Sequence, residues 1–99
     1  MSFLRVALKK PSAGNCREIR RLILEKLVLG RNWGMNYLSY EDIPKGLPKA
    51  YPKGWYYDEI NNLVKDSLLL KYKKRFYRLN IQMKPQIEAL IGKKVPPKT

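Results

Sequence analysis

Side chains that could carry out catalysis are few in this sequence. Two adjacent acidic pairs, Glu41 with Asp42 and Asp58 with Glu59, are of a type that can hold Mg²⁺ in a nuclease. Neighbours in sequence point to different sides of a helix, however, and no second acidic cluster accompanies them. The absence of histidine excludes Ser/His/Asp and Cys/His triads and imidazole metal sites. We therefore expect no enzymatic activity, no metal site, no cofactor and no small-molecule ligand.

The single cysteine, Cys16, cannot form a disulfide within the chain. Its position on an expected helix beside Arg17 and Glu18 favours a small packing residue. A reactive thiol is the alternative interpretation.

Basic side chains dominate the chemistry of the chain. It carries 21 Lys and Arg against 8 Asp and Glu, a net charge of +13 over 99 residues. A compact domain with this charge repels itself unless an anionic partner is present. DNA, RNA and anionic membranes are all suitable polyanions. Because the basic residues are scattered and no expected helix has the divided face of an interfacial helix, we expect a nucleic acid and no membrane.

Length and hydrophobicity place the chain among small globular domains. With 44% hydrophobic residues, it is long enough for one domain and too short for two. The N-terminal "MSFLRVALKK" lacks the apolar run of a secretion signal, and no uncharged stretch reaches membrane-spanning length. We expect a soluble, cytoplasmic protein.

The chain divides into a basic N-terminal arm at 1–14, a folded domain at 15–91 and a basic tail at 92–99. Apolar and basic residues nearly alternate in the arm, which ends at Pro11, Ser12 and Gly14. Its Lys9 and Lys10 are candidate phosphate contacts. Equally, the arm could cover one edge of the core.

The first helix is expected to begin at an N-cap, Asn15, with Glu18 completing a capping box, and to stop at Gly30. Helical spacing assigns its core face to Ile19, Leu22, Ile23 and Leu27. The basic residues are expected on the solvent side: Arg17, Arg20, Arg21 and Lys26.

The segment 31–55 is irregular because it contains three Pro-Lys pairs, which exclude a long helix. A brief strand is expected at Met35, Tyr37 and Leu38, then a short helix over 39–43 capped by Ser39 with Asp42, with Ile43 and Leu47 turned inward. The lysines of the pairs, Lys45, Lys49 and Lys53, are candidate phosphate contacts. A rigid surface linker is the alternative interpretation.

A second long helix and a hairpin follow. Helical spacing places Tyr56, Ile60, Leu63, Val64 and Ser67 on one face and leaves outside it Tyr57, Glu59, Asn61, Asn62 and Lys65. After Ser67 the period becomes two, and "LLLKY" and "FYRLN" alternate around "KKR", as in an antiparallel hairpin with a cationic tip. Asn80 caps a last expected helix with Pro85 in its first turn and Gly92 at its end.

This element order resembles a winged helix-turn-helix domain of the MarR-like and PadR-like regulators. The resemblance rests on "YDEINNLV", "KDSLL", "LKYKKRFYRLN" and "IQMKPQIEALI". It implies an α+β fold of three helices with a two- or three-stranded wing and a short C-terminal helix. This sequence has Ser67 where the turn before the wing usually has glycine.

In such a domain the helix at 56–65 would enter the DNA major groove. Asn61 and Asn62 could contact adenine edges, or lie on a solvated face, while Tyr57 and Lys65 would contact the backbone. The wing contacts would come from Lys71, Lys73, Lys74, Arg75 and Arg78. Asp58 and Glu59, expected at the start of this helix, would oppose phosphates.

We therefore expect a nucleic-acid-binding protein that favours double-stranded DNA, a small transcriptional regulator or architectural factor of an archaeon or an archaeal virus. The alternative is a ribonucleoprotein component that binds structured RNA, like a winged-helix protein of the small ribosomal subunit. The compact wing favours DNA, whereas the basic arm, tail and Pro-Lys loop favour RNA. The chain could be a monomer or a homodimer.

Overall fold

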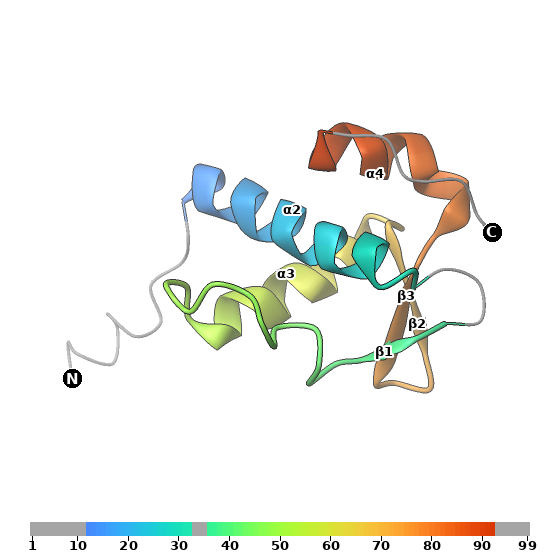
Figure 1. Ribbon diagram of the computed structural model, residues 1–99, viewed down its shortest axis with the longest axis horizontal. Coiled ribbons are helices and arrows are strands. Elements are labelled where there is room, and N and C mark those ends of the chain that lie inside the picture. The colour runs from blue at the N-terminus through green and yellow to red at the C-terminus, as the bar shows by residue number, and fades with distance from the viewer. Residues whose placement is uncertain (1–11, 33–35, 93–99) are drawn as a thin grey trace.

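A computed structural model describes residues 12–32 and 36–92 of the chain (Figure 1). The predicted contacts Lys9 and Lys10, residue Met35 and the tail from 93 lie outside the described residues. The described part is α+β, with three α-helices and a three-stranded antiparallel sheet. Its elements are α2 (Ala13–Leu29), β1 (Leu38–Ser39), α3 (Lys53–Lys65), β2 (Leu69–Tyr72), β3 (Phe76–Leu79), a 3₁₀ turn (Ile81–Met83) and α4 (Lys84–Ile91). No described helix is both long and apolar enough to cross a membrane.

Helix α2 begins earlier than its sequence predicts. Ser12 is the N-cap, and its Oγ accepts a hydrogen bond of 3.1 Å from the backbone N–H of Asn15. The predicted capping box of Asn15 and Glu18 is therefore wrong, because the Glu18 carboxylate pairs with Arg21 at 2.8 Å. The first helical turn includes residues 13 and 14, which the sequence assigned to the arm.

The end of α2 lies at Gly30, as predicted, but the left-handed residue is the next one, Arg31, with φ 54°. A Cβ on Gly30 would lie 2.7 Å from Oδ1 of Asn32. Glycine is needed here because the Asn32 side chain approaches the backbone closely.

The hydrophobic core lies where α2 packs between α3 and α4, against one face of the sheet (Figure 1). The three α-helices and strands β2 and β3 contribute fully buried side chains, among them Ile23, Leu27, Ile60, Leu63, Leu69, Tyr77, Leu79 and Ile87. The helical spacing predicted in the sequence therefore holds for most of α2 and of α3, although Leu22, expected on the core face, is only half-buried.

The predicted short helix over 39–43 does not form. One carbonyl, that of Ser39, accepts from the N–H groups of Asp42 and Ile43 at 3.0 and 3.2 Å, and the chain continues in turns. Pro44 and Pro48 have no N–H to donate, so the turn cannot extend into a helix. Ile43 is fully buried and Leu47 packs against the core, as predicted.

The hairpin agrees with its predicted alternation. Strands β2 and β3 pair with Leu69 opposite Leu79 and Tyr72 opposite Phe76, so residues 73–75 form the tip. β1 adds to the free edge of β3, which gives the sheet order β1-β3-β2.

The turn between α3 and β2 corrects one core prediction. Ser67, expected on the buried face, is exposed and left-handed, with φ 65°. The N–H of Ser67 donates to Val64 and that of Leu68 to Leu63, at 3.0 and 2.9 Å, a Schellman ending of the helix. At the other end of the hairpin, Asn80 caps the 3₁₀ turn before α4 through a 3.1 Å hydrogen bond from the N–H of Gln82.

Candidate nucleic-acid interface

The polar residues predicted to contact DNA from α3 do not all lie on the same face of the helix. Asn61, Asn62 and Lys65 are all exposed. Successive residues are about 100° apart around a helix, so Asn61 and Lys65 share the outward face while Asn62 points elsewhere. Asn62 lines a hollow beside Arg20, and its Nδ2 donates to Oε1 of Glu59 at 3.4 Å.

Tyr57, which was predicted to contact the DNA backbone, packs within the protein instead. Its ring stacks on that of Tyr40 with centroids 4.3 Å apart and planes 24° apart, and its side chain is half-buried. This contact holds α3 against the turn that follows β1.

Glu59 is buried, which corrects the prediction that it faces solvent. Its side chain is 6% exposed, and Oε2 lies 2.6 Å from Nε of Arg20. Arg20, also predicted on the solvent side, extends a second ion pair of 2.8 Å to Asp66. Burial acts to lower the pKa of Arg20, but hydrogen bonds to these carboxylates outweigh burial and raise the pKa. Because α3 begins at Lys53, Asp58 lies in its second turn and is the exposed acid there.

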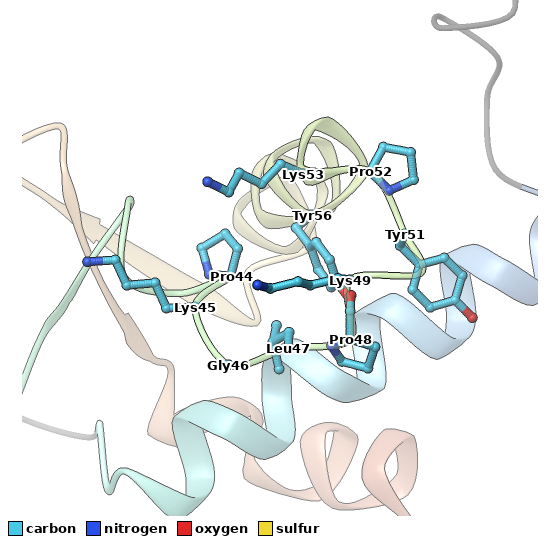
Figure 2. A pocket seen from close by; sticks show the side chains of 10 residues that line it. All are labelled: Pro44, Lys45, Gly46, Leu47, Pro48, Lys49, Tyr51, Pro52, Lys53 and Tyr56. Atoms are coloured by element: carbon cyan, nitrogen blue, oxygen red, sulfur yellow. The ribbon is translucent and has the colours of Figure 1, made fainter.

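The lysines of the Pro-Lys pairs gather around a pocket at the start of α3. Lys45, Lys49 and Lys53 line a hollow of about 560 Å³, and Figure 2 shows their ammonium groups on one side of the loop while Tyr51 points away. The N-cap Pro52 provides no side-chain hydrogen bond, and the first turn of α3 has no acidic residue. The positive end of the helix dipole therefore adds to the lysine charges.

Two of these lysines are free of ion pairs with other described residues. Lys45 forms an ion pair of 3.0 Å with Asp42, and the hydrogen bond between them raises the pKa of Lys45 and lowers that of Asp42. Lys49 and Lys53 are exposed and form no ion pair within residues 12–32 and 36–92. Both are available to an anion outside the chain.

The loop around the pocket is anchored from the core side. Nζ of Lys26 donates to the carbonyls of Asp42, at 2.7 Å, and of Lys45. The hydroxyl of buried Tyr56 donates to the carbonyl of Pro48 at 2.7 Å. Lys26 therefore does not keep to the solvent side as predicted, and burial lowers its pKa. Periodicity could not reveal these anchors, because each joins a helix to a backbone carbonyl of the loop.

The hairpin tip is joined to the turn that follows β1. Arg75 forms an ion pair with Glu41, and its carbonyl accepts from the N–H of Tyr40 at 2.7 Å. Lys73 and Lys74 are exposed at the tip, and Nζ of Lys73 lies 5.3 Å from the ring centroid of Tyr72.

The two remaining predicted wing residues lie below the tip. Lys71 on β2 is exposed and pairs across the sheet with Tyr77. Arg78 on β3 is half-buried, with Cζ 5.6 Å from the ring centroid of Tyr37. The five predicted wing residues therefore do not form one cluster, since Arg78 contacts an aromatic ring on the sheet.

Tyr40 links the separate parts of the interface. Its ring stacks on α3 through Tyr57, and its backbone binds the hairpin tip through Arg75. The loop, α3 and the tip lie on the side of the molecule away from α4 (Figure 1). The exposed cations on these segments that form no ion pair with another described residue are Lys49, Lys53, Lys65, Lys73 and Lys74.

Residues 12–32 and 36–92 contain no cluster of three or more His, Cys, Asp or Glu that could hold a metal ion. Compared with protein-family models, curated proteins and solved structures, the chain gives no significant match.

Proposed function

We propose that this chain is a winged helix-turn-helix domain that binds double-stranded DNA without catalysing a reaction, as a small regulator or architectural factor. The element order α2, β1, turn, α3, β2, β3 and the sheet order β1-β3-β2 support this fold. The left-handed Ser67 supports it too, because it adopts the conformation for which glycine is usual at this turn.

The observation that carries the proposal is the linkage of three cationic segments on one side of the molecule. Lys49 and Lys53 flank the start of α3, and Lys73 and Lys74 lie at the hairpin tip. Two separated groups of cations around an exposed helix suit a duplex, because phosphates line both edges of the groove that the helix enters.

Structured RNA is the second candidate, and Asp58 favours it. This carboxylate is exposed on α3 in the same region as Asn61 and Lys65 and would lie near DNA phosphates if the helix entered a major groove. The lysines of the loop and of the hairpin tip could instead bind an RNA backbone without contacting the bases. RNA duplexes are recognised mainly through their shape and their backbone.

The test is a salt-series titration of the protein against matched DNA duplex, RNA duplex and structured RNA. We expect the DNA duplex to bind most tightly. The double variant Lys49→Ala with Lys53→Ala should reduce the slope of log affinity against log salt by about 1.8, since each lost phosphate contact removes about 0.9.

The matched control is Arg17→Ala with Lys84→Ala. It removes the same charge from α2 and α4, outside the loop and tip. An equal fall in slope for both double variants would mean that binding follows net charge and not this surface. Tighter binding to structured RNA would favour the ribonucleoprotein role.

A further inference from the structure

The face of the sheet turned away from the core carries exposed aromatic rings. Strand alternation places Leu69, Tyr77 and Leu79 on the core face. The opposite face carries Leu70, Tyr72, Phe76 and Arg78. Tyr72 and Phe76, paired across β2 and β3, are 43% and 39% exposed. Exposed aromatic side chains that lie next to one another form a contiguous apolar patch, and such patches mark interaction sites.

Rings and cations combine on this face. Tyr37 precedes β1 and stacks on Tyr72 from the opposite edge of the sheet, with centroids 4.6 Å apart and planes 23° apart. The guanidinium of Arg78 lies 5.6 Å from the centroid of Tyr37, and the ammonium of Lys73 lies 5.3 Å from that of Tyr72. Each ring of the stacked pair therefore has a cation beside it.

A hollow of about 550 Å³ opens next to the rings. Its walls are Tyr37, Tyr72 and Phe76 on the sheet side and Gly30, Asn32 and Asn36 on the other. None of these residues is acidic. Asn36 is exposed and its Nδ2 donates to the carbonyl of Arg31 at 3.1 Å, which leaves its Oδ1 and second N–H for the edge of a base.

We propose that this face binds unpaired nucleotides of a single strand beside the duplex-binding surface, with Lys73 at the border of the two. An exposed ring gains by stacking on a flat apolar group, and cations beside it favour an anionic chain. Single-stranded nucleic acid provides both, because every nucleotide joins a base with a π-face to a phosphate. Bases stack on the exposed surface of Tyr72 and Phe76, while Lys73 and Arg78 contact phosphates.

The test measures binding of a dye-labelled single strand of about 12 nucleotides, a length within the usual site size, by fluorescence anisotropy. Tyr72→Leu and Phe76→Leu keep apolar area and remove the ring. Each should weaken binding about 10-fold, since stacking contributes about 1 to 3 kcal/mol per base. Tyr72→Phe should bind like the unchanged protein, because it keeps the ring.

Titration with a DNA duplex distinguishes single-strand binding by this face from duplex binding by the loop, α3 and the hairpin tip. The Leu variants should leave duplex affinity unchanged, whereas Lys49→Ala with Lys53→Ala should reduce duplex binding and leave the single strand bound. Unchanged single-strand affinity in both Leu variants would overturn the proposal, even if duplex binding is found. A dimer in sedimentation that these variants dissociate, without single-strand binding, would instead assign the face to a second copy of the chain.

A measurement on the unchanged protein avoids dependence on folding of the variants. In an NMR titration with the same strand, stacked bases should shift the ring protons of Tyr72 and Phe76 upfield. Shifts confined to Lys49, Lys53 and Lys65 would place the strand on the duplex surface and overturn the proposal.

Discussion

At the scale of single residues, the most informative contact is the buried ion pair of Arg20 and Glu59. The two residues are 39 positions apart and join α2 to α3, with Nε and Oε2 at 2.6 Å. Within 12–32 and 36–92, no buried side-chain nitrogen or oxygen lacks a hydrogen-bond partner, so this charged pair is satisfied inside the fold. Its role is structural, and it takes Glu59 out of the candidate interface.

Removing one partner of this pair should be costly. We expect Glu59→Ala to lower the free energy of unfolding by about 3 kcal/mol, because Arg20 would keep a partly buried charge with only Asp66 as partner. Urea denaturation followed by circular dichroism measures the change.

Two further variants test the cause of that loss. Asp58→Ala, the exposed neighbour, should change stability by less than about 0.5 kcal/mol. The double variant Arg20→Met with Glu59→Leu should recover most of the loss, because apolar groups of similar size need no charged partner. A loss as large in Asp58→Ala would contradict the assignment of the buried pair.

At the scale of elements, two helices end in left-handed residues that carry side chains. Arg31, with φ 54°, follows the C-cap of α2, and Ser67, with φ 65°, follows the C-cap of α3. For a residue with a Cβ this conformation costs about 1 to 2 kcal/mol. The hydrogen bonds of Ser67 and Leu68 back to the last turn of α3 offset part of that cost.

Ser67→Gly should therefore stabilise the protein by about 0.5 to 1 kcal/mol, since relief of strain exceeds the extra freedom of glycine in the unfolded chain. The measurement is the midpoint of urea denaturation. Gly46→Ala is the reverse control: Gly46 has φ 81°, and a methyl group there would meet nothing within 4 Å, so strain alone should destabilise the variant. A destabilised Ser67→Gly would show that the serine side chain is needed at this turn.

At the scale of the whole molecule, acidic and basic side chains differ in how many of them form ion pairs. Six of the eight acidic residues form ion pairs with described cations: Glu18, Glu25, Glu41, Asp42, Glu59 and Asp66. The cations that form them are Arg20, Arg21, Lys45 and Arg75. Five exposed lysines of the loop, α3 and hairpin tip form no ion pair with another described residue, so a polyanion could bind them: Lys49, Lys53, Lys65, Lys73 and Lys74.

The hairpin tip allows its charge to be removed without disturbing its shape. Lys73 and Lys74 have φ of 50° and 69°, a conformation that Asn and Gly adopt readily. We expect Lys73→Asn with Lys74→Gly to keep or raise stability while lowering the salt slope of duplex binding by about 1.8.

Arg75 is left in place in this variant because it pairs with Glu41. An unchanged slope in a stably folded variant would remove the tip from the interface. Reduced stability would instead mean that the lysine side chains support the turn.

The sequence alone predicted those features that depend on neighbouring residues. Helical spacing identified the buried faces of α2 and α3, and alternation around "KKR" placed the hairpin tip correctly at 73–75. Gly92 was recognised as the end of α4, whereas Asn80, predicted to cap that helix, caps the 3₁₀ turn before it. These signals are local because a helix or hairpin repeats its pattern within a few residues.

Tertiary structure decided which polar residues face solvent and which hold the molecule together. Lys26 and Arg20 are of the same residue types as the cations that face solvent. Lys26 nevertheless binds backbone carbonyls 16 and 19 positions away, and Arg20 binds a carboxylate 39 positions away. The outward aromatic face likewise exists only once Tyr37 meets Tyr72 across the sheet. Periodicity places a residue on one face of its own element, but its partners depend on how separate elements pack.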